Sequence, residues 1–256
     1  MIRPLAFLLG FSVLTACSFD STPSPSPGVA KESDREEVRR DGLAHSAGLG
    51  SQSLAQQSVR TGTSTATSWR EQLAALPQEE ARHLSEKNTN YFGALAYKSV
   101  EERELLKRIG IPLPDDFLTA RRLAVEELKS GAERGDLTAK LIYIDRLIDE
   151  AQRKTTTQDG IAGEEANALA AQASFELGKI KGRSNSAFIP YLDARLFSSG
   201  PPKPEYVTGA MLAAFDRGDT RAIGLLEPYA REHPDVDAMG VAYYFATMKA
   251  DSEVGH

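Results

Sequence analysis

The chain has 256 residues, with 30 Lys and Arg side chains against 36 Asp and Glu, and a single cysteine. A net charge of −6 lacks the basic footprint with which proteins hold phosphate backbones, so this balance excludes a nucleic-acid partner. One cysteine also excludes a disulfide within the chain.

The first residues have the three-part order of a secretory signal. Arg3 supplies a positive charge, an apolar run extends from Leu5 to Leu14, and small residues follow at Thr15 and Ala16. The run has about ten apolar residues, whereas a helix that spans a bilayer core needs about twenty. We therefore expect a cleavable signal peptide over residues 1–16 rather than a transmembrane helix.

The signal ends in Leu14-Thr15-Ala16-Cys17, which resembles the lipobox of bacterial lipoproteins. The resemblance implies diacylglycerol on the sulfur of Cys17, cleavage before it and acylation of the new amino group. Two or more acyl chains anchor a protein stably in a membrane. An ordinary signal with an incidental cysteine is the alternative, but Cys17 is the only cysteine and falls at the cleavage point. By the same resemblance, Ser18 favours sorting to the outer membrane.

A polar linker follows over residues 17–68. From Ser18 to Ser68, 24 of 51 residues are Ser, Thr, Pro or Gly, and Phe19 is the only aromatic. Such a segment buries too little apolar surface to offset its ordering entropy. We expect a disordered tether between the lipid and the folded part.

From Trp69 to the end, apolar residues return at spacings of three and four, which predicts an all-α domain over 69–256. Ser68 and Ser99 are predicted N-caps, and a long helix is predicted to open at Asp115 or Asp116 and to run through Leu128. Tyr91 to Tyr97 is a predicted core patch. No alternating β-branched run appears after Ser68.

The tripeptide Arg-Gly-Asp occurs twice, 83 residues apart, and an alanine lies four residues after each glycine. We expect a helical hairpin at each copy: the glycine takes a positive φ and ends one helix, the aspartate caps the next, and the alanine allows close crossing. The residues assigned to these junctions are Gly135, Asp136, Ala139, Gly218, Asp219 and Ala222.

These junctions resemble those of tetratricopeptide-like helical repeats. The resemblance implies a stack of paired helices with a concave binding surface. Convergent hairpin chemistry in an irregular bundle is the alternative, because the spacing departs from a regular repeat. The expected fold is an all-α, irregular stack of helical hairpins preceded by a disordered tether.

The sequence offers no catalytic residue, metal site or cofactor motif. Its four histidines are not spaced as ligands of one metal ion. Asp145 and Asp149 share a helix face and could flank a glycosidic bond, but we expect them on the solvent side of the helix that buries Leu141 and Ile144. Three acids and an aromatic side chain converging in one cleft would instead indicate an enzyme.

Three residues are candidates for contact with a partner protein. Tyr244 is predicted to lie opposite the face formed by Val241 and Phe245, as an exposed anchor. Arg121 and Arg122 could meet a partner's carboxylates, although a solvated face is the simpler interpretation.

We therefore expect a non-catalytic protein that is lipid-anchored in the outer membrane, faces the periplasm and binds another protein through its helical domain. The alternatives are an envelope enzyme acting on peptidoglycan or glycan, a periplasmic immunity or inhibitor protein, and a purely structural spacer.

Overall fold

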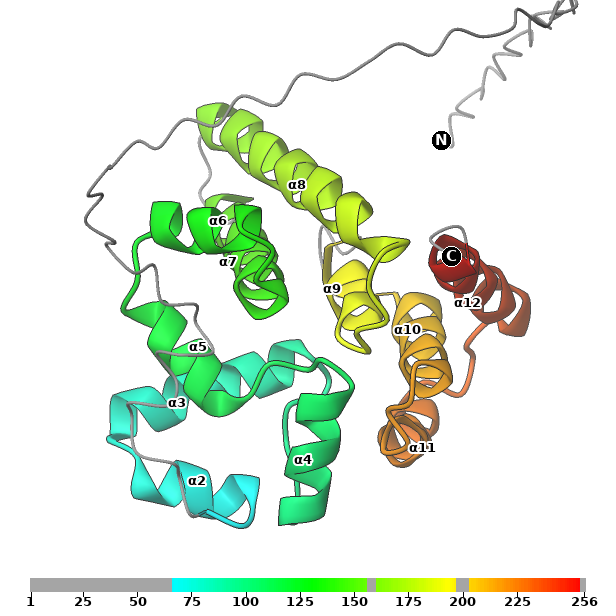
Figure 1. Ribbon diagram of the computed structural model, residues 1–256. Coiled ribbons are helices and arrows are strands. Elements are labelled where there is room, and N and C mark those ends of the chain that lie inside the picture. The colour runs from blue at the N-terminus through cyan, green and yellow to red at the C-terminus, as the bar shows by residue number, and fades with distance from the viewer. Residues whose placement is uncertain (1–65, 156–159, 197–202, 254–256) are drawn as a thin grey trace, which may run out of the picture. The chain divides into compact units, whose positions relative to one another are not determined.

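The computed structural model describes residues 66–155, 160–196 and 203–253. Within these ranges every regular element is an α-helix and no strand occurs, which confirms the predicted all-α class (Figure 1). The predicted signal peptide, Cys17 and nearly all of the predicted linker lie outside the described residues. The helices are α2 (Trp69–Ala75), α3 (Gln78–Asn90), α4 (Val100–Arg108), α5 (Pro114–Arg121), α6 (Val125–Glu133), α7 (Leu137–Thr155), α8 (Gly160–Lys181), α9 (Ile189–Leu196), α10 (Pro204–Asp216), α11 (Ala222–Glu232) and α12 (Ala238–Glu253).

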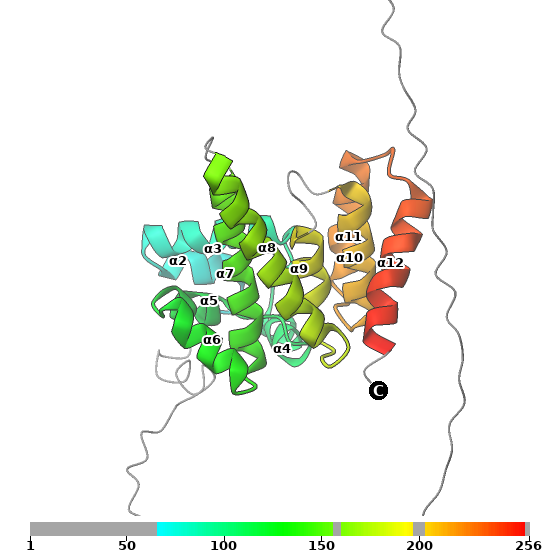
Figure 2. The same ribbon diagram turned by 90° about the horizontal axis from the view of Figure 1, so that it is seen from above.

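Helices that are neighbours in the sequence pack against each other. α6 packs against α7, α7 against α8, and α10 against α9, α11 and α12. Figure 1 shows α9 between α7 and α8 on one side and α10 on the other, and Figure 2 shows the same order from above. This arrangement is the irregular stack of helical hairpins that the sequence predicts.

α7 lies at the centre of the core and packs against α5, α6, α8 and α9. Its apolar side chains from Leu141 to Ile148 are each at most 5% exposed. The predicted core patch after α3 is confirmed, because Tyr91 and Tyr97 are buried at 0% and 2% exposure. Each fully buried large side chain contributes roughly 1.5 to 3 kcal/mol, so α7 and this patch supply much of the stability of the domain.

Both predicted serine caps are confirmed. The Ser68 hydroxyl accepts a hydrogen bond from the Glu71 backbone N–H at 3.4 Å, and the Glu71 carboxylate accepts one from the Ser68 N–H at 3.1 Å. At α4, the Ser99 hydroxyl accepts the Glu102 N–H at 3.3 Å. Such caps satisfy donors that the first helical turn leaves without a partner.

The long helix predicted to open at Asp115 or Asp116 is two helices, α5 and α6, and neither aspartate is the N-cap. Pro114 takes the first helical position of α5, where its missing N–H costs nothing. Asp116 instead accepts the Leu113 N–H at 2.8 Å. The extended backbone of Ala124 then separates α5 from α6.

The two Arg-Gly-Asp tripeptides end α6 and α10 with the same geometry. Gly135 has a φ of +91° and Gly218 a φ of +99°, in the left-handed region that favours glycine. At each junction the aspartate N–H bonds to the carbonyl five residues earlier, and the glycine N–H bonds to the carbonyl three residues earlier. This is the Schellman pattern that closes a helix, so both predicted helix ends are confirmed.

The two aspartates differ. Asp136 caps α7 as predicted, since its Oδ1 accepts the Ala139 N–H at 3.0 Å. Asp219 is not a cap, because α11 begins three residues later and its N-cap is Arg221. The Asp219 carboxylate is fully buried and accepts from Nε and Nη2 of Arg221, each at 2.9 Å, and from the Tyr191 hydroxyl at 3.3 Å. The extra turn residues bring Arg221 back over Asp219, which is why the predicted cap is wrong.

The junction alanines permit close packing, as expected. Ala139 and Ala222 are both 0% exposed. A Cβ built on Gly131 of α6 would lie 3.0 Å from the Cβ of Ala139, so α6 and α7 cross closely at this point.

Candidate functional site

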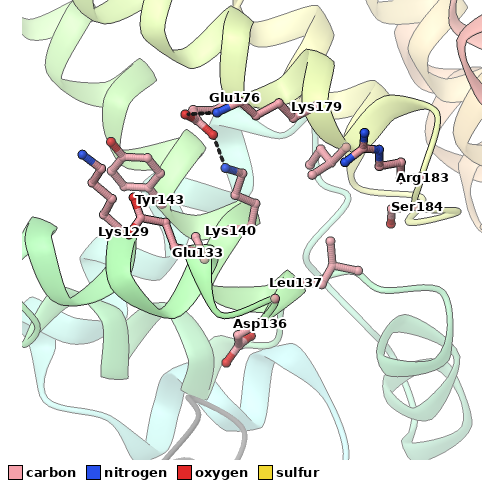
Figure 3. Close-up of a pocket in the computed structure, with 13 residues that line it drawn as sticks. Lys129, Glu133, Asp136, Leu137, Lys140, Tyr143, Glu176, Lys179, Arg183 and Ser184 are labelled. Atoms are coloured by element: carbon pink, nitrogen blue, oxygen red, sulfur yellow. Dashed lines mark hydrogen bonds and ion pairs between the residues drawn. The ribbon is translucent and has the colours of Figure 1, made fainter. Parts of the chain in front are cut away.

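A groove of about 520 Å³ lies where the α6–α7 junction faces the last turns of α8 (Figure 3). This volume is within the range of ligand-binding sites in proteins. Its walls combine charged side chains with apolar ones. The lining residues are Lys129, Ala132, Glu133, Gly135, Asp136, Leu137, Lys140, Tyr143, Glu176, Lys179, Ile180, Arg183 and Ser184.

Glu176 is at the centre of the charges in this groove. It pairs with Lys140 of α7, and its other oxygen pairs with Lys179 at 3.0 Å (Figure 3). Burial alone would raise the pKa of Glu176, but the hydrogen bonds from both lysines hold it below its ordinary value. The carboxylate therefore stays ionised and joins α7 to α8.

Other cations of the groove remain open to solvent. Lys129 and Arg183 are exposed, and neither forms an ion pair with any residue that the structure describes. Arg183 directs its guanidinium toward the groove, whereas the carboxylate of Asp136 is turned away from it (Figure 3). Leu137 is 37% exposed in the same wall. The groove thus offers cations beside an apolar surface.

A second constellation is a buried ionic cluster between α3, α7 and α9. Lys87 donates to Asp145 at 2.5 Å and also to Asp149. Arg195 donates to Asp145 at 2.7 Å, also pairs with Asp149, and bonds to the Tyr91 hydroxyl at 3.1 Å. The side chains of Lys87, Asp145 and Arg195 are at most 6% exposed. The name ionic cluster refers below to these five residues.

The expectation that Asp145 and Asp149 lie on the solvent side of their helix is wrong. Asp145 is 2% exposed, and the side chain of Asp149 is 27% exposed. Asp145 follows Leu141 by four residues and so borders the apolar face of α7, where α9 and α3 bring one cation each to the two aspartates. Two cations balance two carboxylates, so the cluster is neutral.

A polar cleft of about 360 Å³ opens beside Asp149, and Glu86, Lys87 and Arg195 also line it. Asp145 and the ring of Phe117 line a small cavity of about 60 Å³ that shares Lys87 and Asp149 with this cleft. Glu86 and Asp149 line the cleft, and Asp145, Asp149 and Phe117 line the cavity. Acids and an aromatic ring therefore lie near each other, although neither hollow holds three acids together with an aromatic side chain.

The carboxylates of this cleft are already occupied, however. Each oxygen of Asp145 and Asp149 accepts at least one hydrogen bond from Lys87, Arg195 or Tyr91. Burial would raise the pKa of Asp149, but Lys87 and Arg195 hold it below its ordinary value. A general acid needs a raised pKa, so this carboxylate is set for structure rather than for proton transfer.

In the terminal helix α12, the exposed tyrosine is the neighbour of the one that was predicted. Tyr244 is only partly exposed and lies against Tyr206 of α10, with ring centroids 3.8 Å apart. Tyr243 is the exposed aromatic, at 66%. The predicted exposed anchor is therefore wrong by one residue, because α10 packs on the face that carries Tyr244.

Arg121 and Arg122 are exposed, but both are used within the chain. Arg121 pairs with Glu79 and Arg122 with Glu80, each at 2.8 Å. These pairs link α5 to α3, so the two arginines do not offer unpaired charges to a partner.

Among the residues that the structure describes, no group of three or more His, Cys, Asp or Glu side chains is arranged to hold a metal ion. In the same part of the chain, no helix has the length and apolar character needed to cross a membrane. No family model matches the chain, and no curated protein or solved structure is significantly similar to it.

Proposed function

We propose that this chain is a lipid-anchored protein of the outer membrane, facing the periplasm, whose helical domain binds another protein without catalysing a reaction. The observation that carries the proposal is Cys17: it is the only cysteine, and it follows the apolar run and the small residues Thr15 and Ala16. The diacylglycerol on its sulfur and the acyl group on its amino nitrogen would together give stable membrane attachment.

Replacing Cys17 with serine is expected to abolish attachment, because a hydroxyl group is a much weaker nucleophile than a thiolate toward the lipid donor. Cells that express the chain and are fed radiolabelled palmitate should label the wild type and leave Cys17→Ser unlabelled. The matched control Ser18→Ala should keep the label. Equal labelling of wild type and Cys17→Ser would contradict the proposed anchor.

The exposed face of α12 supports protein binding. Met239 and Tyr243 are 78% and 66% exposed, and the exposed Ala242 and Ala246 complete the spacing of one helix face. Exposed contiguous apolar surface on a soluble domain marks an interaction site. This α12 stripe carries no charge, so the complementary surface on the proposed partner should also be apolar.

The substitution Tyr243→Asp is expected to weaken partner binding about 30-fold, since truncating an aromatic anchor costs about 2 kcal/mol. The partner is first captured by crosslinking in intact envelopes, and its equilibrium affinity is then measured for each variant. Ala230→Asp introduces the same charge at an exposed position of α11 and should bind like the wild type. Equal affinity of Tyr243→Asp would remove the stripe from the interface, and self-association of the wild type in sedimentation would point to a second copy as the occupant.

An envelope enzyme acting on glycan is the second candidate, favoured by Asp145, Asp149 and Phe117, which line one small cavity next to the polar cleft. The occupied carboxylates of the ionic cluster count against it. The purified chain should therefore release no soluble fragments from peptidoglycan. Release that Asp149→Asn abolishes would favour the enzyme.

A further inference from the structure

The Arg183 end of the groove has a surplus of positive charge next to apolar surface. Four basic side chains line the whole groove, Lys129, Lys140, Lys179 and Arg183, against three acidic ones, Glu133, Asp136 and Glu176. Lys140 and Lys179 pair with Glu176, and the carboxylate of Asp136 is turned away from the groove, so Arg183 is the uncompensated cation at its end (Figure 3). The chain as a whole has the opposite balance, with 36 acidic side chains against 30 basic ones. This local surplus therefore distinguishes the groove from the average surface.

We propose that the groove holds an acidic segment of the partner protein, with a carboxylate on Arg183 and Lys179 and a neighbouring apolar side chain on Leu137 and Ile180. The inference rests on the proposed function and names the chemistry that the partner must present. It involves a surface separate from the α12 stripe, since none of the groove residues belongs to α12.

The side chains present favour a carboxylate beside an apolar group. A guanidinium binds a carboxylate through two parallel hydrogen bonds, and Arg183 has no ion-pair partner in the described part of the chain. Lys179 is held in place, because its ammonium group bonds to Glu176 and lies 4.2 Å from the centroid of the Phe175 ring. Leu137 keeps 37% of its surface open for a partner side chain.

The partner segment is longer than one charged group. A volume of about 520 Å³ admits several side chains, and exposed Lys129 lies at the opposite end from Arg183 (Figure 3). A peptide with acidic residues on either side of an apolar residue would meet cations at both ends. Because these pairs lie at the solvent-exposed rim, their contribution should fall as salt rises.

The test is selection from a random library of peptides about twelve residues long, displayed on phage, against the full chain in detergent. The selected peptides should be enriched in Asp and Glu next to Leu, Ile or Met. In fluorescence anisotropy, the double variant Lys179→Glu with Arg183→Glu should bind such a peptide at least about tenfold more weakly than the wild type. Circular dichroism checks that the variant is folded; if it is not, Lys179→Gln with Arg183→Gln should weaken binding in the same direction.

The matched control is Arg70→Glu with Lys98→Glu, which changes charge equally at exposed positions outside the groove and should bind within twofold of the wild type. Selected peptides without acidic residues, or equal binding to both double variants, would overturn the proposal. Tyr243→Asp should bind the peptide normally. If Tyr243→Asp loses the envelope partner while no acidic peptide is selected, only the groove proposal fails. If an acidic peptide is selected but no envelope partner is captured, the proposed protein-binding function fails instead.

Discussion

Replacing Asp145 with alanine is expected to lower the free energy of unfolding by about 3 to 5 kcal/mol. Asp145 accepts hydrogen bonds from Lys87 at 2.5 Å, from Arg195 at 2.7 Å and from the Tyr91 hydroxyl at 2.5 Å. Without it, two buried cations face only Asp149, whose side chain is 27% exposed. Removing one partner of a buried ionic group leaves an uncompensated charge at low dielectric, and this cost exceeds the energy of the lost bonds.

Urea denaturation followed by circular dichroism measures this loss. The control is Glu150→Ala, five residues later in α7, whose side chain is 39% exposed and pairs with Arg153. It should change stability by no more than about 0.5 kcal/mol. Adding Lys87→Met to Asp145→Ala should recover part of the loss, because both charges of one pair are then absent. Asp145→Ala as stable as Glu150→Ala would refute the structural role of the ionic cluster.

The two Arg-Gly-Asp aspartates are expected to differ in their effect on stability. Asp219→Ala should cost about 3 to 5 kcal/mol, because it leaves Arg221 without its buried carboxylate. Arg221 also donates to the carbonyl oxygens of Ala94 and Ala96, so the same side chain ties α11 to the segment after α3. Asp136→Ala removes a helix cap and should cost about 1 kcal/mol.

The same urea measurement on both variants decides this contrast. Each variant serves as the control for the other, because the surrounding tripeptide and the Schellman geometry are shared. Equal losses of unfolding free energy in the two variants would mean that the buried Asp219 carboxylate contributes no more than a helix cap.

The spacing of apolar residues predicted the all-α class, and the Arg-Gly-Asp tripeptides predicted the junctions. Both signals depend on local chemistry. The positive φ at Gly135 and Gly218 follows from glycine's lack of a Cβ, and the cap at Ser68 from its hydroxyl. These features require no knowledge of how distant helices pack. The sequence therefore sufficed for them.

The ionic cluster could not be predicted in this way. An apolar face on Leu141 and Ile144 identifies the buried side of α7, but it does not reveal that α3 and α9 extend this burial to Asp145 at the edge of that face. One signal was present: Arg195 lies in a short helix that is otherwise largely apolar, and Asp145 lies within the apolar run from Leu141 to Ile148 of α7, with the opposite charge. Lys87 gave no signal, because it belongs to a helix rich in charged residues.

The error at Tyr244 has a similar cause. α12 is apolar on most sides, so its pattern does not distinguish the face that meets α10 from the face that meets solvent. Gly209 settles this in the structure: a Cβ there would lie 3.0 Å from the Cβ of Tyr244, which shows how closely α10 approaches that side. The exposed anchor passes to Tyr243.

If the helical domain works from a membrane anchor, Cys17 must carry lipid. Mass spectrometry of the amino-terminal peptide, from protein purified out of native membranes, decides this. The expected chain begins at Cys17, with diacylglycerol on the sulfur and an acyl group on the amino nitrogen. A chain that still carries residues 1–16, or one with an unmodified thiol, would contradict the lipid anchor.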